Sequence, residues 1–253
     1  MQFDFSERTI IVTGAGGGIG GATCRALHAA GANVVAVDRS ADTLAALEAE
    51  LKAAGGTAPL CLALDVTSEA DMTAMAEKTV AAFGRIDGLV AAAGILRTSG
   101  QPHAVSDTGF DEWRTIMDVN LTGTFLSNRA VLPAMQAQGQ GDIVNISSVS
   151  GQKGRAFDGP YSASKFGIIG LSESLAEEVQ RLGLRVQTVL PDAVDTPLWD
   201  QSGTAALKPQ NMLTAQRVAE FVLYLMALPR DVYIMNSVLS PLRSRVRKRK
   251  PQA

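Results

Sequence analysis

The stretch TIIVTGAGGGIG, residues 9–20, decides the fold of this chain. Its first half is an apolar run of strand length, and its second half is a glycine-rich turn that opens a helical pattern from about Gly18 to Ala30. Glycines let the main chain turn tightly under a pyrophosphate, and the helix N-terminus offers free N–H groups and partial positive charge to the phosphate oxygens. The spacing of Gly14, Gly18 and Gly20 therefore predicts a dinucleotide-binding turn, with a plain tight turn as the alternative.

Apolar runs of strand length and helical patterns alternate through the rest of the chain, which indicates a parallel sheet covered by helices on both faces. Further strands are expected at 33–37, 59–64, 86–92, 142–147, 184–190 and 231–239. Further helices are expected at 41–54, 68–83, 111–138, 160–182 and 214–228, the second of them opened by a capping box of Ser68 and Asp71. This order predicts an α/β fold: a doubly wound parallel sheet in a single three-layer α/β/α domain over residues 1–242.

Composition excludes several other classes of protein. With 253 residues, 46% apolar and 19% charged, the chain is neither disordered nor fibrous. Its longest unbroken apolar run, residues 221–228, is shorter than the ~18 residues that a membrane helix needs. The opening MQFDFSERTIIVTG has no basic start and so predicts no signal peptide. Cys24 and Cys61 are too few for a disulfide framework, so we expect them to pack in the core of a protein of the reducing cytoplasm.

Charge is distributed unevenly along the chain. The formal net charge is −2, but six of the 23 basic residues lie in the tail at 243–253, which leaves 17 basic and 25 acidic residues, a net charge of −8, on residues 1–242. An acidic body argues against a general nucleic-acid-binding protein. We expect the tail to be a solvated terminus; contact with phosphates or an acidic partner is the alternative.

Two carboxylates follow predicted strands and are candidates for nucleotide recognition. Asp38 ends the second strand, where a carboxylate can accept hydrogen bonds from both ribose hydroxyls of an adenosine and repel a 2′-phosphate. This favours NAD over NADP, although the neighbouring Arg39 offers a guanidinium that could bind such a phosphate. Asp65 follows the third strand and could accept from the adenine amino group; a carboxylate near a helix start is the alternative.

The motif YSASK, residues 161–165, places a phenol and an ammonium on one helix face, about 6 Å apart along the axis. At about 5 Å and an effective dielectric constant of about 20, the ammonium would stabilise a phenolate by roughly 3 kcal/mol, or about two pKa units. Tyr161 could then act as a general acid/base, with a chance surface pair with Lys165 as the alternative. Ser148 follows a predicted strand at the sheet edge where such folds bind ligands, so its hydroxyl could donate to a substrate oxygen.

With these motifs assembled, the chain resembles the short-chain dehydrogenase/reductase family, in the branch whose chains have about this length. The resemblance covers nearly the whole chain and rests on TGAGGGIG (13–20), Asp38, LDV (64–66), VNLTGTF (119–125), IVNISS (143–148), YSASK (161–165) and VDTP (194–197). It implies a Rossmann fold and hydride transfer to or from a nicotinamide cofactor.

The resemblance also implies roles for four catalytic residues. Tyr161 would be the general acid/base, and Ser148 would orient the reacting oxygen. Lys165 would hold the nicotinamide ribose and lower the tyrosine pKa. Asn120 would bind a water that links Lys165 to solvent.

Further residues are implied at the cofactor and the substrate. Val194 and Thr196 would meet the nicotinamide carboxamide, and residues 195–212 would form a mobile substrate lid. The full set of cofactor-binding residues expected is Gly14, Gly17, Gly18, Ile19, Gly20, Asp38, Asp65, Val66, Ala92, Gly94, Tyr161, Lys165, Val194 and Thr196. Trp199, Met212 and Leu213 are candidates for the substrate pocket, with packing as the alternative.

Three departures from the family pattern stand out. AAAG at 91–94 replaces the usual NNAG, so we expect a modest loss of stability and no loss of activity. Asp192 replaces the usual glycine after Pro191, and its carboxylate could select a hydroxyl-bearing or cationic substrate; a solvent-facing or capping carboxylate is the alternative. The ending at 227–241 replaces a glycine-rich ending common in the family's tetramers, which leaves dimer and tetramer as alternatives. A homo-oligomer is expected because the helices that carry Asn120 and Tyr161 commonly build a dimer face in this family.

These observations predict an NAD-dependent dehydrogenase or reductase of secondary alcohols and ketones. An NADPH-dependent 3-oxoacyl-thioester reductase is the nearest alternative, and Asp38 argues against it. A non-catalytic NAD(H) sensor or scaffold that uses the basic tail is the alternative outside enzymes. His28 and His103 have no partners at ligand spacing, so no metal site is expected. The short apolar runs and the acidic body likewise predict no membrane or nucleic-acid partner.

Overall fold

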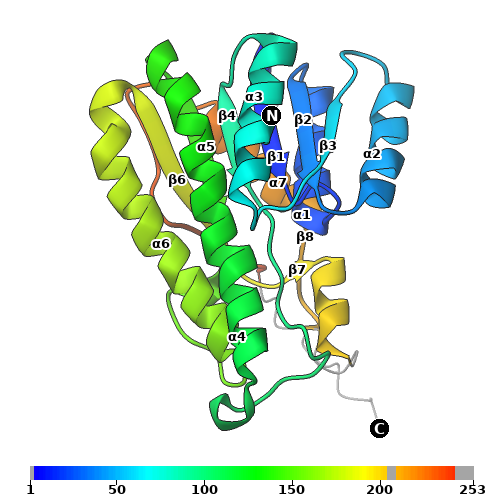
Figure 1. The fold of residues 1–253 in the computed structure, drawn as a ribbon, viewed down its shortest axis with the longest axis vertical. Helices are drawn as coiled ribbons and strands as arrows, with labels where there is room; N and C mark the ends of the chain where they lie inside the picture. Colours follow the sequence, from blue (N-terminus) through cyan, green and yellow to red (C-terminus); the bar gives the residue numbers. More distant parts are fainter. Residues whose placement is uncertain (1–2, 204–208, 243–253) are drawn as a thin grey trace, which may run out of the picture.

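The computed structural model describes residues 3–203 and 209–242, and within them seven strands form one sheet in the order β3-β2-β1-β4-β5-β6-β9 (Figure 1). Every neighbouring pair is parallel. The strands are β1 (Thr9–Thr13), β2 (Asn33–Asp38), β3 (Leu60–Ala63), β4 (Gly88–Ala91), β5 (Gly141–Ile146), β6 (Leu184–Pro191) and β9 (Ser237–Leu239). A separate two-stranded ribbon pairs β7 (Val194–Asp195) with β8 (Leu213–Thr214).

Helices cover both faces of this sheet. They are α1 (Gly18–Ala29), α2 (Ala41–Ala53), α3 (Glu69–Phe83), α4 (Phe110–Met117), α5 (Gly123–Gln138), α6 (Gly159–Val179) and α7 (Ala215–Met226). In Figure 1, α3, α5 and α6 lie in front of the sheet, and α1 and α7 lie behind it. None of the helices in the described ranges is long and apolar enough to cross a membrane. The predicted doubly wound α/β/α fold is confirmed.

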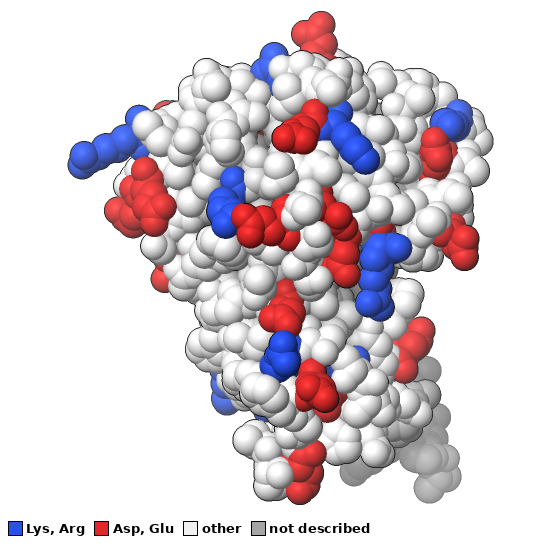
Figure 2. Space-filling model, viewed as in Figure 1, with Lys and Arg blue, Asp and Glu red and all other residues white. Residues whose placement is uncertain are grey.

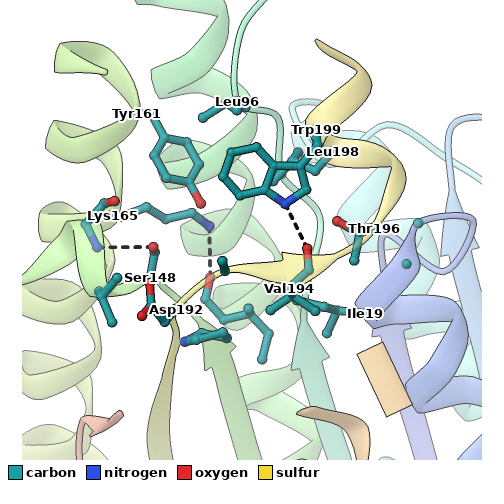
Figure 3. Close-up of a pocket in the computed structure, with 18 of the residues that line it drawn as sticks. Ile19, Leu96, Ser148, Tyr161, Lys165, Asp192, Val194, Thr196, Leu198 and Trp199 are labelled. Carbon is teal, nitrogen blue, oxygen red and sulfur yellow. Dashed lines mark hydrogen bonds between the residues drawn. The ribbon is translucent and has the colours of Figure 1, made fainter. Parts of the chain in front are cut away.

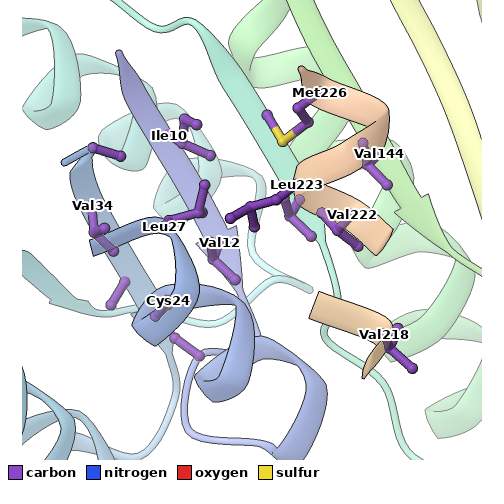
Figure 4. Close-up of a cluster of buried hydrophobic side chains, with 14 of the residues drawn as sticks. Ile10, Val12, Cys24, Leu27, Val34, Val144, Val218, Val222, Leu223 and Met226 are labelled. Carbon is purple, nitrogen blue, oxygen red and sulfur yellow. The ribbon is translucent and has the colours of Figure 1, made fainter. Parts of the chain in front are cut away.

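The hydrophobic core has two halves because successive strand residues point to opposite faces. On β1, Ile10 and Val12 face α1 and α7, whereas Ile11 faces the α3 and α5 side. Figure 4 shows the first half, where Leu27 and Val222 from the two helices pack against the strand side chains. Strands buried on both faces explain why their sequences read as continuous apolar runs.

The strand order reverses between β1 and β4, so the chain leaves these neighbouring strands in opposite directions. In open α/β sheets a crevice forms at such a switch point, outside the carboxyl ends of the strands. The glycine-rich turn follows β1, the loop starting at Ala92 follows β4, and Ser148 follows β5. The topology therefore brings these segments to one edge of the sheet.

Several predicted elements have different boundaries in the structure. The helix expected at 111–138 is interrupted by a π-helical turn, Asp118–Thr122, between α4 and α5. The strand expected at 231–239 is paired only over β9, because the preceding residues are bound by side chains instead. The capping box is half formed: Ser68 Oγ accepts from the Asp71 N–H, but the Asp71 carboxylate accepts from the Asp65 N–H.

A buried carboxylate fixes the C-terminal segment to the opposite edge of the sheet. Asp142, at the start of β5, accepts from the guanidinium groups of Arg8, Arg185 and Arg230 at 2.7–2.9 Å, and its side chain is only 1% exposed. Arg185 Nη1 also donates to the carbonyls of Leu228, Pro229 and Val232. One ion cluster therefore holds the chain between α7 and β9.

Candidate active site

A cavity of about 520 Å³ lies at the carboxyl edge of the sheet (Figure 3). Its walls come from the glycine-rich turn, the ends of β4, β5 and β6, the start of α6 and the segment after β7. The predicted residues that line it are Gly14, Gly17, Gly18, Ile19, Gly20, Ala92, Gly94, Ser148, Tyr161, Lys165, Asp192, Val194, Thr196 and Trp199. The structure thus brings most of the predicted site residues together from segments far apart in the sequence.

The glycine-rich turn has the shape that a phosphate group requires. Gly14 has φ +68°, and a Cβ there would lie 2.7 Å from Ala93 Cα. A Cβ on Gly18 would lie 2.4 Å from Cγ2 of Thr196. No side chain caps the N-terminus of α1 at Gly17, so the N–H groups of the first turn are left for an anion. These residues fit the pyrophosphate of a dinucleotide.

Asp38 is held beside this turn by main-chain hydrogen bonds. Its two carboxylate oxygens accept from the N–H groups of Gly16 and Ser40, both at 3.0 Å. Arg39, the alternative phosphate ligand, is exposed. Asp38 does not line the cavity itself but contacts the glycine-rich turn through the Gly16 N–H.

Two other predicted cofactor residues are not brought to the cavity. The Asp65 carboxylate accepts from the N–H and hydroxyl of Thr67, both at 2.8 Å. Val66 is buried, and a Cβ on Gly123 would lie 2.7 Å from its Cγ2, so Val66 packs against the start of α5. Their position satisfies local turn and packing needs, which spacing alone could not separate from cofactor binding.

Tyr161, Ser148 and Lys165 lie together in the cavity (Figure 3). The hydroxyl of Ser148 lies near the phenol of Tyr161 and acts to lower its pKa. Lys165 Nζ donates to the Ile146 carbonyl at 2.9 Å and lies 5.6 Å from the centre of the Tyr161 ring. A hydroxyl, a phenol and an ammonium are therefore gathered in the wall of one cavity.

Burial changes the acid–base properties of this group. It raises the pKa of Tyr161 to about 12, against a lowering by the Ser148 hydroxyl, and the Asp158 carboxylate raises it further. Burial also lowers the pKa of Lys165 to about 8. The raised pKa of Tyr161 shows that burial outweighs the lowering expected from Lys165, because desolvation disfavours both charged forms.

Asn120 lies in the π-helical turn and braces the catalytic helix. Its Oδ1 accepts from the Ile95 N–H at 2.8 Å, and its Nδ2 donates to the Ile95 carbonyl and to Ser164 Oγ at 2.9 and 3.0 Å. Ser164 Oγ in turn donates to the Tyr161 carbonyl at 2.7 Å. Single π turns often occur at functional sites, and here the turn aims the amide at the loop after β4.

Gly94 lies between Asn120 and Lys165. A Cβ added there would lie 3.3 Å from Asn120 Oδ1 and 3.5 Å from Lys165 Nζ. The absence of a side chain at Gly94 therefore leaves the space between Asn120 and Lys165 open for the water expected to link them.

The segment after β7 covers the cavity from the substrate side. It forms a short helix, Pro197–Ser202, in which Trp199 Nε1 donates to the Val194 carbonyl at 2.8 Å. Met212 and Leu213 do not line the cavity: Leu213 packs on the core, and Met212 borders a separate hollow. Residues 204–208 of the expected lid, and the tail at 243–253, lie outside the described residues.

Sequence reasoning missed three polar residues at this end of the cavity. Gln201 Oε1 accepts from the N–H groups of Leu96 and Arg97 at 2.7 and 3.2 Å, which ties the short helix to the loop after β4. Arg97 forms an ion pair with Asp158, the residue before α6. These partners are 61 or more residues apart, and no local pattern in the sequence indicates them.

The residues set aside from the site have structural surroundings. Cys24 is buried and Cys61 is half-buried against the same core cluster, which confirms their expected packing. His28 Nε2 lies 3.1 Å from the Thr57 carbonyl, and His103 borders a small hollow behind Tyr161. Over the described ranges no group of three His, Cys, Asp or Glu side chains could hold a metal ion.

Comparisons with known proteins identify the family of this chain. A family model described as short chain dehydrogenase matches residues 8–206. The crystal structure of a levodione reductase is similar with a TM-score of 0.82 at 29% identity, covering 93% of this chain and 96% of that one. A cis-4-hydroxycyclohexanecarboxylate dehydrogenase of Sinomonas cyclohexanicum is 40% identical over 77% of this chain and 76% of its own. A 2-dehydro-3-deoxy-L-rhamnonate dehydrogenase (NAD(+)) of Sphingomonas sp. is 36% identical over 78% and 76%.

The fold and site thus define an oxidoreductase that binds a nicotinamide cofactor and acts on alcohol or ketone substrates. The chain belongs to the short-chain dehydrogenase/reductase family.

Proposed function

We propose that this protein is an NAD-dependent dehydrogenase of secondary alcohols that also reduces the corresponding ketones. The observation that carries the proposal is the meeting of Tyr161, Ser148 and Lys165 in one cavity under an uncapped, glycine-rich helix start. When bound, the nicotinamide supplies or accepts the hydride.

The chain's own residues would move the proton and hold the reacting oxygen. In oxidation, Tyr161 takes the hydroxyl proton of the alcohol; in reduction, it returns a proton to the carbonyl oxygen. Ser148, which lies near the phenol in the same cavity, donates to the same oxygen from the second side. Two further hydrogen bonds fix the surroundings of Tyr161. Lys165 Nζ donates to the Ile146 carbonyl, and Asn120 Nδ2 donates to Ser164 Oγ. We assign Lys165 to the ribose of the cofactor and Asn120 to a water next to Lys165.

The choice of NAD over NADP rests on Asp38. Its carboxylate is oriented by two main-chain N–H groups, so it is preorganised to accept from ribose hydroxyls and to repel a 2′-phosphate. The NAD(+)-dependent rhamnonate dehydrogenase among the relatives supports the same choice. An NADPH-dependent reductase of 3-oxoacyl thioesters would require the exposed Arg39 to outweigh this carboxylate.

For the substrate we propose a ring-shaped secondary alcohol or ketone with a second polar group. One relative is named for a hydroxycyclohexanecarboxylate. The cavity of this chain offers apolar walls from Leu96, Leu198 and Trp199, and a polar side that includes Asp192. No residue of the described ranges pairs with the Asp192 carboxylate, although its main-chain N–H donates to the Leu239 carbonyl. We therefore assign Asp192 to a hydroxyl group of the substrate.

We also propose that the protein works as a homo-oligomer in the cytoplasm. Large apolar side chains are exposed on α4, α5 and α6, namely Phe110, Trp113, Phe125 and Phe166. A second copy of this chain would cover them, as a dimer or a tetramer. The free thiols of Cys24 and Cys61 suit a reducing compartment.

The charges on the face that carries α5 and α6 argue against the alternative of a scaffold that binds nucleic acid. Figure 2 shows acidic and basic side chains interspersed over this face, with no continuous basic surface among the described residues there. Such a surface would not attract a phosphate backbone, and an enzyme is the better proposal.

Turnover of a panel of cyclic secondary alcohols with NAD, followed at the nicotinamide absorbance, tests the proposal. We expect reduction of NAD with at least one cyclic alcohol and a loss of about 10²- to 10⁴-fold in Tyr161→Phe. Activity that survives in Tyr161→Phe, or no activity with any alcohol or ketone of the panel, would contradict it. Equal rates with NADP would overturn the assignment of Asp38.

A further inference from the structure

An ion pair borders the same small hollow as Tyr161. The guanidinium of Arg97, from the loop after β4, pairs with the carboxylate of Asp158. The two side chains are only 10% and 20% exposed. Asp158 borders both the main cavity and the small hollow behind it, and Tyr161 borders both as well. The pair therefore lies in the wall next to the phenol.

Asp158 is placed where a carboxylate commonly caps a helix, but it does not do so. It precedes the first residue of α6, and its side chain makes no capping hydrogen bond. Only its carbonyl serves the helix, by accepting from the Ser162 N–H at 2.8 Å. The carboxylate is turned to Arg97 instead, so its charge is offset by a cation from another segment of the chain.

The position of Arg97 is fixed by bonds to its main chain. Its N–H donates to Gln201 Oε1, and the neighbouring Ile95 is bonded through both its N–H and its carbonyl to Asn120. The loop that carries Arg97 is thus held by the substrate-side helix and by the π-helical turn. A guanidinium on a fixed loop can offset a fixed carboxylate at low entropic cost.

We propose that Arg97 is a positioning residue that neutralises Asp158 beside Tyr161, so that the reacting phenol adjoins a neutral ion pair instead of a bare carboxylate. The inference rests on the proposed role of Tyr161 as general acid/base. A like charge next to a phenolate disfavours its formation, and the Asp158 carboxylate already contributes to the raised pKa of Tyr161. Without Arg97 the uncompensated charge of Asp158 would disfavour the Tyr161 phenolate more strongly.

Other charged or titratable groups face Tyr161 from the elements around it. They are Lys165 on α6, Arg155 and Asp158 before it, Asp192 after β6, Arg97 and His103 after β4, and Glu112 on α4. Glu112 accepts from the Thr98 N–H and the Ser99 hydroxyl, which stabilise its charge. Arg155 is exposed and lines the cavity, and its charge acts on Asp158 more weakly than the charge of Arg97 does. Arg97 is the cation that directly contacts Asp158.

The test compares single variants, because a charge role and a structural role predict different signs. The measurement is kcat/KM for alcohol oxidation against pH, with NAD, along the limb where activity rises as the phenol loses its proton. Arg97→Gln should move this limb to higher pH, on the order of one pH unit, which is about tenfold lower activity at a fixed pH. Asp158→Asn should move it to lower pH. The double variant should return close to the original position.

Arg97→Lys keeps the charge and should move the limb less than Arg97→Gln. Arg129→Gln is the matched control, since it removes a guanidinium from an exposed ion pair between Arg129 on α5 and Glu69 on α3, and neither residue lines the cavity. It should leave the limb in place. If Arg97→Gln does not fold, Asp158→Asn alone still tests the sign.

Shifts of the same sign, or no shift, in Arg97→Gln and Asp158→Asn would overturn the inference and leave a purely structural ion pair. The two proposals fail in different ways. Activity that persists in Tyr161→Phe contradicts the proposed function itself. A Tyr161→Phe variant without activity, together with an unmoved limb in Asp158→Asn, contradicts the role of Arg97 alone.

Discussion

The ammonium of Lys165 lies 5.6 Å from the centre of the Tyr161 ring, and in the wall of the cavity Lys165 is buried and Tyr161 is partly buried. Proximity alone would favour a phenolate beside an ammonium. Burial acts in the opposite direction on each partner, since it raises the pKa of the phenol and lowers the pKa of the ammonium. The resting site is therefore a neutral phenol that can donate a proton.

This protonation state predicts different pH dependences for the two directions of the reaction. Because the pKa of Tyr161 is raised to about 12, ketone reduction should be independent of this group from pH 6 to 9, where the phenol stays protonated. Alcohol oxidation needs the deprotonated form, so its kcat/KM should rise by up to about tenfold per pH unit over the same range. Steady-state rates in both directions check this. A bell with its maximum near neutral pH in oxidation would contradict the prediction.

Lys165 predicts a pH dependence of stability. Its pKa is lowered from 10.5 to about 8, so between these values the unfolded chain binds a proton that the folded chain does not, and stability rises with pH. From pH 8 to 10 this group should add about 2 kcal/mol to the free energy of unfolding. Lys165→Met should lack the rise, whereas the exposed Lys153→Met should keep it. Urea unfolding at several pH values measures the difference, and equal slopes in both variants would refute it.

Asp38 predicts the preference between the two nicotinamide dinucleotides. Asp38→Asn keeps an oxygen for one hydrogen bond but removes the charge that repels a 2′-phosphate. We expect the ratio of the dissociation constants for NADP and NAD to fall by about tenfold or more, since the loss of one charged hydrogen bond is worth 1.5–3 kcal/mol or roughly that factor. Calorimetric titration of both dinucleotides measures it. Asp42→Asn, on the first turn of α2, is the matched control and should leave the ratio unchanged.

Asp192 predicts selection among substrates of one shape. Cyclohexane-1,4-diol should be oxidised with a higher kcat/KM than cyclohexanol, because its second hydroxyl can donate to the unpaired carboxylate. Asp192→Ala should lower the diol value by about tenfold, the worth of one hydrogen bond to a charged group, and leave cyclohexanol within about twofold. The exposed Asp200→Ala serves as the control. An unchanged ratio of diol to cyclohexanol in Asp192→Ala would remove the selective role.

Asp142 predicts a large effect on stability far from the site. Its carboxylate is shared by three arginines, and its removal leaves a buried guanidinium of Arg185 without its partner. Asp142→Ala should lower the free energy of unfolding by about 3–5 kcal/mol. Glu69→Ala, which breaks the exposed pair with Arg129, should cost less than about 1 kcal/mol. Chemical denaturation compares them, and similar losses in both variants would contradict the role of Asp142.

Much of the fold and part of the site could be predicted because their signals are local. The alternation of apolar runs and helical patterns depends on the period of each element, and Ile10, Ile11 and Val12 show why a strand buried on both faces reads as a continuous run. The glycine-rich turn and the four-residue step from Tyr161 to Lys165 are also local, since backbone geometry alone fixes what they present. The turn and the Tyr161–Lys165 pair meet in one cavity because of the strand order, and the alternation of strands and helices in the sequence already favours such a doubly wound order.

The tertiary structure decided whatever depends on partners distant in sequence. The direction of the Tyr161 pKa shift required the burial of the phenol, which helix spacing does not contain. The same holds for the Arg97–Asp158 pair and for the hydrogen bonds of Gln201 to the loop after β4. Desolvation and ion pairing depend on what packs around a group in three dimensions, so a sequence can place two side chains on a helix face and still leave their charge states open.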